Sequence, residues 1–295
     1  MGTSGSTSNS VESVSTNKIV DTLPRGDFYQ DVGDIRIHYN IVGDGPMLIH
    51  QTGIWIVDWR TSVGAITEAL SKHFTVLTMD PRGQGKTTLG SGPTTYGRLG
   101  SDTVRLMDAL GIESAHFFGV SDGGCIQLQM LLDFEERIKS ATLCGTPNTH
   151  ESYTPLARTA FEAWRKEMLS DSDVFLDQFG NVMSDDFVNM LRAGYANASP
   201  NPERFLEVMK QQRRSWSTEP DISLKRLSAI RKRVLVITTD SDEFIPLSAM
   251  NAMASAIPGA ETAFFEGMTH DPKPQMESIA ERLAGFVASV EHANL

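Results

Sequence analysis

The sequence has few cysteines, no long apolar run and no excess of positive charge, and each of these absences narrows its possible functions. Only two of its 295 residues are cysteines, Cys125 and Cys144. That is too few for a disulfide framework and favours a reducing compartment such as the cytoplasm. No stretch of about 20 apolar residues could span a bilayer, so no membrane partner is expected. The formal net charge of −11 argues against nucleic acid as a partner, because its phosphate backbone is also negative.

The N-terminal end differs in composition from the rest of the chain. Residues 1–20 are rich in Ser, Thr, Gly and Asn, and they lack the basic and apolar regions of a secretory signal peptide. Residues 1–25 are therefore predicted to form a flexible tail. Apolar residues make up 40% of the whole chain, which is enough for a substantial core in the remainder.

Short apolar segments alternate with helical ones over most of the chain. Strands are predicted at Ile35–Val42, Met47–His50, Thr75–Met79, Ala115–Val120, Ser140–Cys144, Val234–Thr238 and Thr262–Phe265. Helices are predicted at Trp59–Lys72, Gly97–Leu110, Gly123–Phe134, Leu247–Ala256 and Met276–Glu291. This alternation predicts right-handed βαβ units in a mostly parallel, doubly wound α/β sheet that begins with an antiparallel strand.

The alternation stops over residues 147–227, which have helical patterns and no convincing strand. This stretch is too long for a simple loop. It is predicted to be a helical cap that covers one end of the sheet, with the core domain formed by residues 26–146 and 228–295. Some of its Met and aromatic side chains are expected to line a pocket, although ordinary packing is the commoner role for any single one.

The pattern Gly-x-Ser-x-Gly occurs at Gly119-Val120-Ser121-Asp122-Gly123, after a predicted strand and before a predicted helix. A reactive serine must project from the sheet, so the backbone turns sharply there, and side chains two residues away would collide with the turn. The first N–H groups of the following helix can stabilise an oxyanion at the same place. Ser121 is therefore the expected nucleophile.

The adjacent Asp122 is an alternative nucleophile. In that frame Val120 would stand where the turn favours glycine, whereas the frame centred on Ser121 has glycine on both sides. Asp122 is instead expected to donate its backbone N–H to the oxyanion and to begin the helix, where a carboxylate is favourable.

A serine nucleophile needs a base, and the base needs an acid that orients it. Asp240 and Asp242 follow one predicted strand, and His270 follows the last one. The carboxyl ends of parallel strands share the sheet edge where open α/β sheets bind ligands. The chain order Ser, Asp, His is a known order for such a triad, and position alone leaves both aspartates open.

These motifs resemble the α/β-hydrolase superfamily over about residues 28–290. The resemblance implies an eight-stranded sheet with a helical cap, and an activity of the serine esterase or lactonase type. In that family the acid typically lies three residues after a small residue and four before a proline. Thr239 and Pro246 stand in these positions, which favours Asp242 over Asp240. The family's alternative place for the acid, at the end of the preceding strand, has no carboxylate here.

The resemblance also implies the remaining parts of the site. His270 matches the family's base, although it follows Thr269 where glycine is usual. The family often has His-Gly after the strand at 47–50, and this chain has His50-Gln51. The backbone N–H groups of Thr52 and Asp122 are then the expected oxyanion donors.

A glycine-rich segment at 80–87 comes close to a phosphate-binding loop. However, Asp80 stands where that loop requires glycine, and helix-breaking residues follow it. Its Asp-x-Arg-Gly-x-Gly pattern is frequent in α/β-hydrolases, so nucleotide binding is not expected.

The expected reaction is cleavage of a carboxylic ester or lactone of a mid-sized, largely apolar molecule through an acyl-enzyme on Ser121. Neither a metal nor an organic cofactor is expected, and the sequence does not indicate an oligomeric state. Two alternatives stay open. One is a carbon–carbon bond hydrolase of the same fold, and the other is a non-catalytic ligand-binding protein on this scaffold, which turnover would distinguish.

Overall fold

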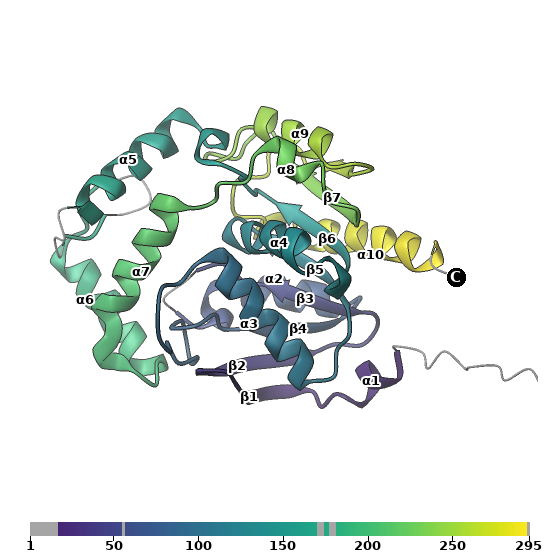
Figure 1. Cartoon of the computed structure of the whole chain (residues 1–295), viewed down its shortest axis with the longest axis horizontal. Coiled ribbons are helices and arrows are strands. Elements are labelled where there is room, and N and C mark those ends of the chain that lie inside the picture. Colours follow the sequence, from purple (N-terminus) through teal and green to yellow (C-terminus); the bar gives the residue numbers. More distant parts are fainter. Residues whose placement is uncertain (1–16, 55–56, 170–173, 177–180, 294–295) are drawn as a thin grey trace, which may run out of the picture.

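The computed structural model describes residues 17–54, 57–169, 174–176 and 181–293. Its centre is an eight-stranded sheet with the strand order β1-β2-β4-β3-β5-β6-β7-β8 (Figure 1). The strands are β1 Gly26–Val32, β2 Ile35–Val42, β3 Met47–Gln51, β4 Thr75–Met79, β5 Ala115–Val120, β6 Ile138–Cys144, β7 Arg233–Thr238 and β8 Glu261–Phe264. β2 pairs antiparallel with β1 and β4, and the remaining pairs are parallel. The predicted fold class is confirmed.

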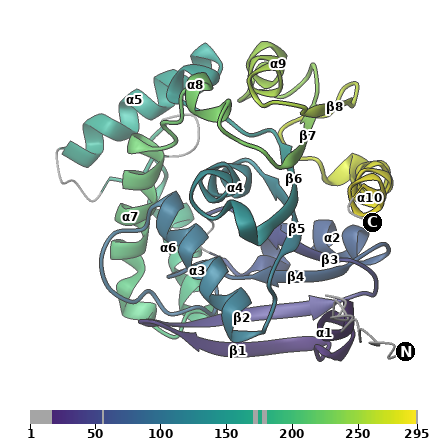
Figure 2. The same ribbon diagram turned by 45° about the vertical axis from the view of Figure 1, so that its right-hand side comes forward.

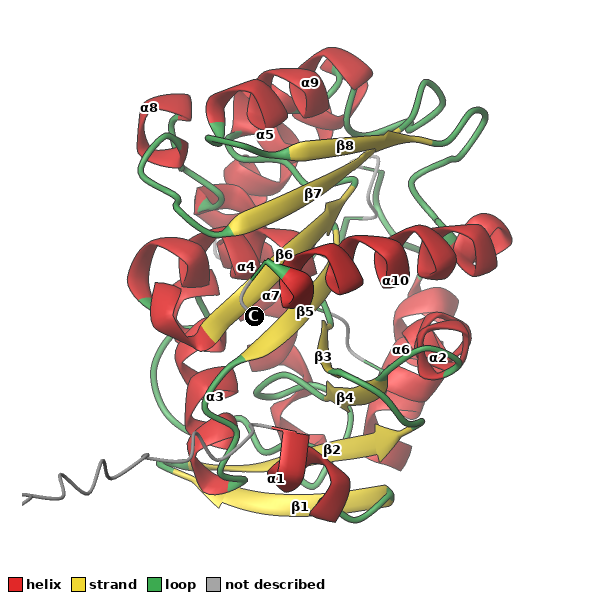
Figure 3. Cartoon of the chain, turned by 90° about the vertical axis from the view of Figure 1, so that its right-hand side faces the viewer, coloured by secondary structure: helices red, strands yellow, loops and turns green. Residues whose placement is uncertain are grey.

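Helices cover both faces of the sheet (Figure 2). One face packs against α3 Tyr96–Ala109, α4 Asp122–Asp133 and α9 Leu247–Ala256, and the other against α2 Trp59–Ser71 and α10 Met276–His292. Figure 3 shows α10 crossing in front of the strands. The central strands are buried on both sides, so that Phe117 of β5 faces the first layer and Phe118 the second. Burying each such ring stabilises the fold by roughly 1.5–3 kcal/mol.

The N-terminal part of the structure differs from the predictions in two ways. Where residues 17–25 were predicted to be flexible, α1 Asn17–Thr22 forms a short helix, Val20 is buried against the core, and Arg25 donates a hydrogen bond to the carbonyl of Gly43. β1 was not predicted at all. It is an edge strand rich in polar residues, with no continuous apolar pattern to reveal it, and it pairs along its whole length with β2.

Between β6 and β7 the chain forms a segment that we term the helical insertion, residues 147–227. Its helices are α5 Pro155–Leu169, α6 Asp185–Ala198, α7 Phe205–Thr218 and the short α8 Leu224–Leu227. The 3-10 turn η2 His150–Ser152 precedes α5, and η3 Pro202–Arg204 lies between α6 and α7. Two further 3-10 turns, η1 Glu135–Arg137 and η4 Lys273–Gln275, belong to the core domain. α5, α6 and α7 lie together at one side of the sheet (Figure 1).

The insertion has a small apolar cluster of its own, formed by Phe175, Tyr195, Phe205 and Val208 together with Leu89 of the core. Residues 170–173 and 177–180 of the predicted cap lie outside the described residues, as do residues 1–16 of the predicted tail. The role of the insertion as a cap stays a prediction. None of the described helices is long and apolar enough to cross a membrane.

Candidate active site

Ser121 lies at the sharp turn between β5 and α4, at the carboxyl end of the sheet. Its φ of 53° and ψ of −119° make it the sole non-glycine residue with a positive φ in the described part of the chain. Such a conformation costs roughly 1–3 kcal/mol and must be held by its surroundings. The N–H of Ser121 donates to the carbonyl of Cys144 at 2.9 Å, and its carbonyl accepts from Cys125 at 3.1 Å. These bonds hold the side chain at the rim of the sheet.

The glycines on either side of Ser121 have no room for a side chain. A Cβ on Gly119 would lie 2.6 Å from the carbonyl carbon of Gly123. A Cβ on Gly123 would collide with the carbonyl oxygen of Gln51. The pattern that identified Ser121 therefore reflects a real steric requirement, because the helix that begins at Asp122 is packed against the loop after β3.

The loop after β7 brings an acid to the imidazole of His270. Nδ1 of His270 lies 3.0 Å from Oδ1 and 2.9 Å from Oδ2 of Asp242. Oδ1 of Asp242 also accepts the N–H groups of Phe244 and Ile245, each at 2.9 Å. These bonds hold the buried carboxylate in place, and the carboxylate in turn orients the imidazole through Nδ1. The other ring nitrogen, Nε2, is not used in these bonds.

Opposing effects act on the charge of His270. Burial disfavours the imidazolium, but the hydrogen bond and charge of Asp242 favour it, as do the charges of Glu243 and Asp122, and together they raise the pKa of His270 above its ordinary 6.5. Oε2 of Glu243 accepts the backbone N–H of His270 at 3.0 Å, and the ring of Phe244 packs against the imidazole. His270 is therefore suited to hold a proton transiently.

The other candidate acid, Asp240, lies elsewhere. Its Oδ1 accepts the N–H of Gly267 at 2.8 Å and the hydroxyl of Ser241 at 3.0 Å. The bond from Gly267 lowers the pKa of Asp240. Asp240 thus shapes the loop that carries His270, and the imidazole is bonded to Asp242.

The end of β6 connects the serine turn with the His–Asp pair. Cys144 accepts the bond from Ser121, and the next residue, Gly145, has a φ of +52°. A Cβ on Gly145 would lie 2.9 Å from Oδ2 of Asp242 and 3.2 Å from Nδ1 of His270. One strand end therefore has the nucleophile candidate on one side and the base and acid candidates on the other.

The two expected oxyanion donors lie on adjoining segments. Thr52 is buried after β3, and its hydroxyl donates to the carbonyl of Met79 at 2.9 Å. Asp122 is the first residue of α4, where a backbone N–H has no partner within the helix. The close approach of Gly123 to Gln51 brings these two segments together.

The side chain of Asp122 is held by three donors that the sequence did not reveal. Oδ1 accepts the hydroxyl of Tyr96 at 2.5 Å. Oδ2 accepts the indole N–H of Trp216 at 2.7 Å and the N–H of Ile54 at 3.4 Å. Burial raises the pKa of Asp122 despite these three bonds. Nearby, Oε2 of Glu219 accepts the N–H of Tyr96, and burial also raises the pKa of Glu219.

Aromatic side chains of the helical insertion continue from Trp216. Trp216 stacks on Trp164 with 5.0 Å between the ring centroids, Trp164 meets Phe161 edge-on at 4.9 Å, and Phe161 contacts Tyr153 at 4.4 Å. His150 packs against Phe161 as well, and its Nε2 lies 3.0 Å from the carbonyl oxygen of Trp216. These rings form a mostly buried aromatic cluster that extends from Asp122 into the insertion.

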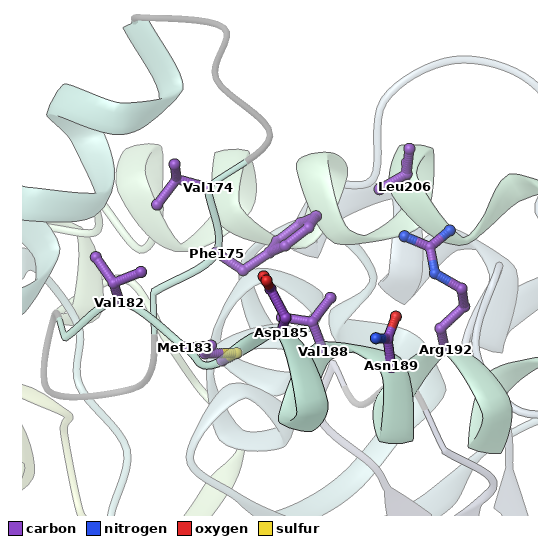
Figure 4. A pocket seen from close by; sticks show the side chains of 9 residues that line it. All are labelled: Val174, Phe175, Val182, Met183, Asp185, Val188, Asn189, Arg192 and Leu206. Carbon is purple, nitrogen blue, oxygen red and sulfur yellow. The ribbon is translucent and has the colours of Figure 1, made fainter.

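A surface cavity of about 390 Å³ lies in the helical insertion, apart from these residues (Figure 4). It is lined by Val174, Phe175, Val182, Met183, Asp185, Val188, Asn189, Arg192 and Leu206. Neither Ser121 nor His270 is among these lining residues, so this cavity is separate from the candidate active site.

Sequence reasoning named Ser121, Asp242, His270, Thr52 and Asp122, and the structure places all five at the carboxyl ends of β3, β5 and β7 and in the loop after β8. It missed three contributors, Gly145, Tyr96 and Trp216. A glycine directly after a predicted strand was a usable signal for Gly145. Tyr96 and Trp216 carry no such local signal, because their role depends on contacts 26 and 94 residues away in the chain.

Comparison with known proteins identifies the family of the chain. The family model of the alpha/beta hydrolase fold matches residues 46–272, and the chain belongs to this family. Two curated relatives carry the name 2-hydroxy-6-oxo-6-phenylhexa-2,4-dienoate hydrolase. One, from Comamonas testosteroni, is 27% identical over 226 residues, or 74% of this chain and 79% of the relative. The other, from Burkholderia cepacia, is 27% identical over 267 residues, or 86% and 90%.

Solved structures show the same fold at lower identity. An enol-lactonase from Burkholderia xenovorans aligns with a TM-score of 0.62 and 23% identity, covering 88% of this chain and 100% of that one. A meta-cleavage product hydrolase from Pseudomonas fluorescens aligns with a TM-score of 0.66 and 22% identity, covering 91% and 98%. The protein is thus an enzyme of the α/β-hydrolase type.

Proposed function

We propose that the protein hydrolyses a carboxylic ester or lactone, with Ser121 as nucleophile, His270 as general base and Asp242 as the acid that orients the base. The observation that carries this proposal is the bond of His270 to both carboxylate oxygens of Asp242, beside the strand end that also holds the strained Ser121. A serine, an imidazole and a carboxylate form a set that catalyses acyl transfer, and their order along this chain is the one known for α/β-hydrolases.

In the proposed reaction, Oγ of Ser121 attacks the carbonyl carbon while Nε2 of His270 takes the hydroxyl proton. The carbon–oxygen bond to the leaving alcohol then breaks, and His270 returns the proton to that oxygen. Water attacks the resulting acyl-enzyme by the same route and releases the acid. Asp242 stabilises the imidazolium that forms in each half of the reaction.

The negative oxygen of each tetrahedral intermediate would accept hydrogen bonds from the backbone N–H groups of Thr52 and Asp122. Removing one such donor typically costs on the order of 100-fold to 1000-fold in rate. Here both donors belong to the backbone, so their direction depends on the loop after β3 and on the first turn of α4.

The surroundings of Ser121 favour an uncharged substrate with apolar groups. Within the aromatic cluster, the rings of Trp216 and Phe161 are partly exposed and offer an apolar contact. Two titratable groups near the triad, Asp122 and Glu219, are acidic. An acidic side chain is neutral when protonated and negative when ionised, so it cannot attract a substrate carboxylate. These two side chains therefore favour a neutral ester or lactone as the substrate.

A carbon–carbon bond hydrolase is the second candidate, because the relatives from Comamonas and Burkholderia are named as dienoate hydrolases. The same serine, histidine and oxyanion donors could serve that reaction. Its substrates carry a carboxylate, however, and the acidic groups around Ser121 disfavour such a ligand.

The test compares wild type with Ser121→Ala on p-nitrophenyl acetate, butyrate and octanoate, on a δ-lactone, and on a 2-hydroxy-6-oxo-dienoate. Labelling with a serine-directed fluorophosphonate is followed in parallel. We expect turnover of the esters or the lactone, with labelling, and the loss of both in the mutant. Turnover of the dienoate alone would replace the ester proposal with the second candidate. A folded wild type that neither turns over nor labels would refute the nucleophile assignment.

A further inference from the structure

Helix α7 of the insertion reaches both segments that carry the proposed oxyanion donors. Nε2 of Gln212 donates to the carbonyl of Ile54 at 3.0 Å, two residues after Thr52. Nε1 of Trp216 donates to Oδ2 of Asp122 at 2.7 Å. Gln212 and Trp216 are four residues apart, so they lie on the same face of the helix, one turn from each other.

The two segments are also bonded to each other at this point. The N–H of Ile54 donates to Oδ2 of Asp122 at 3.4 Å, the same oxygen that accepts from Trp216. Three hydrogen bonds and one turn of α7 therefore link Gln212, Ile54, Asp122 and Trp216 in a closed ring. One side of this ring is formed by α7. The opposite side is formed by the segment after β3, which carries Thr52, and by the start of α4, which carries Asp122.

The carboxylate at the centre of this ring is held from both the core and the insertion. Tyr96 of α3 donates to its Oδ1, while Trp216 binds its Oδ2 and is itself stacked on Trp164 of α5. Asp122 is half-buried, so the loss of one of these partners would leave its carboxylate with one hydrogen bond fewer. The position of the Asp122 side chain therefore depends on how α7 packs against the core.

We propose that α7 is a positioning element of the oxyanion hole, in which Gln212 and Trp216 hold the Ile54 and Asp122 segments at their working separation. This inference rests on the proposed function, because the N–H groups of Thr52 and Asp122 serve as donors only there. Gln212 and Trp216 are positioning residues, since they act through the carbonyl of Ile54 and the carboxylate of Asp122.

This role has a kinetic signature that a wall of the substrate pocket would lack. The oxyanion is negative in the tetrahedral intermediate and not in the bound substrate, so misplaced donors reduce kcat. Loss of a contact that only binds substrate raises KM and leaves kcat unchanged. A displacement of the donors by a fraction of their bond length is expected to cost on the order of 10-fold to 100-fold in kcat.

The experiment uses Trp216→Phe, which keeps an aromatic ring and removes the indole N–H, and Gln212→Met, which keeps the length of the side chain and removes the amide. The matched control is Gln211→Met. Gln211 lies on the same helix and also joins α7 to the core, but its Oε1 accepts from Thr94, at 3.0 Å from the N–H and 2.7 Å from the hydroxyl. That contact includes neither Ile54 nor Asp122. Folding of every variant is checked by its Tm.

Rates are measured with p-nitrophenyl butyrate. Inhibition is measured with propylboronic acid, which adds to Oγ of Ser121 and places a negative boronate oxygen in the hole, and with butyrate as an acid that forms no such adduct. We expect kcat to fall 10-fold to 100-fold in Trp216→Phe and Gln212→Met, with KM within threefold. Affinity for the boronic acid should fall in parallel with kcat, affinity for butyrate should not, and Gln211→Met should stay within threefold of wild type.

Unchanged kcat in both variants, a rise in KM alone, or an equal loss of kcat in Gln211→Met would overturn the inference and leave the proposed function standing. If one variant does not fold, the other decides. A wild type that fails to turn over the ester and to bind the boronic acid would overturn the proposed function, and this inference with it.

Discussion

The imidazole of His270 is bonded to both carboxylate oxygens of Asp242, at 2.9 and 3.0 Å from Nδ1. Asp240, two residues earlier, accepts instead the N–H of Gly267 in the loop after β8. The two aspartates have the same side chain and stand two positions apart, but of the two it is Asp242 that contacts the proposed base.

This difference predicts opposite outcomes for two matched substitutions. Asp242→Asn should lower kcat by roughly 10⁴-fold, because an amide cannot hold the imidazole in the required tautomer or stabilise the imidazolium. Asp240→Asn should leave kcat nearly unchanged. Steady-state rates of both variants with p-nitrophenyl butyrate check this, and a larger loss in Asp240→Asn would show that the acid has been assigned to the wrong residue.

The raised pKa of His270 predicts the acidic limb of the pH–rate profile. The base must be neutral to accept a proton, so activity should rise with pH and reach half its plateau above pH 6.5. The carboxylates whose charges raise the pKa of His270 are Asp242, Glu243 and Asp122. Glu243→Gln removes one of these charges while keeping an acceptor for the N–H of His270, so the midpoint should move to lower pH with little change in the plateau.

The kcat/KM profiles of wild type and Glu243→Gln between pH 4 and 9 would measure this shift. Asp240→Asn is a suitable control, because that carboxylate bonds to Gly267 and to Ser241. A midpoint that stays in place or rises in Glu243→Gln would contradict the assignment of His270 as the titrating base.

Gly145 is predicted to be required for the geometry of the triad. A methyl group there would lie 2.9 Å from Oδ2 of Asp242 and 3.2 Å from Nδ1 of His270, so Gly145→Ala should displace the pair and lower kcat on the order of 100-fold. Gly259→Ala is the matched control, because Gly259 also has a positive φ, +70°, but has nothing within 4 Å of an added Cβ.

Both alanine variants should lose roughly 1–2 kcal/mol of stability from the left-handed backbone, measured by urea unfolding. Only Gly145→Ala should lose activity. Equal kcat values in the two variants would mean that the contact with the His–Asp pair has no catalytic consequence.

His50 gives a prediction about stability. It is fully buried, its Nδ1 lies 2.9 Å from the hydroxyl oxygen of Thr67, and burial lowers its pKa to about 3, against about 6.5 in an unfolded chain. Below pH 6.5 the unfolded chain takes up a proton that the folded protein refuses. The contribution of His50 to stability is therefore complete above pH 6.5 and falls as the pH drops towards 3.

Wild type should accordingly lose stability relative to His50→Leu by about a factor of ten in the folding equilibrium constant for each pH unit below 6.5. Urea unfolding of both proteins at pH 5, 6, 7 and 8 measures the difference. Curves that run parallel over this range would show that His50 titrates in the folded protein as it does in the unfolded chain.

The fold was largely predictable because its core strands are buried on both faces. β2, β4 and β5 have the predicted bounds, and the other predicted strands and helices differ by a few residues at most. β1 escaped prediction because an edge strand with polar residues has no continuous apolar pattern. α1 escaped because the burial of Val20 depends on the assembled core and not on local composition.

The sequence by itself determined the turn at Ser121, because the steric needs of a sharp strand-to-helix connection are local and appear as glycines at fixed spacing. It also determined the order of the site candidates along the chain and the sheet edge at which they meet. Only the tertiary structure decided that His270 contacts Asp242, and that Gln212 and Trp216 of α7 reach Ile54 and Asp122. The contacts of α7 join residues 158 and 94 positions apart, and pairing over such distances is set by how the helices pack, which neither periodicity nor spacing records.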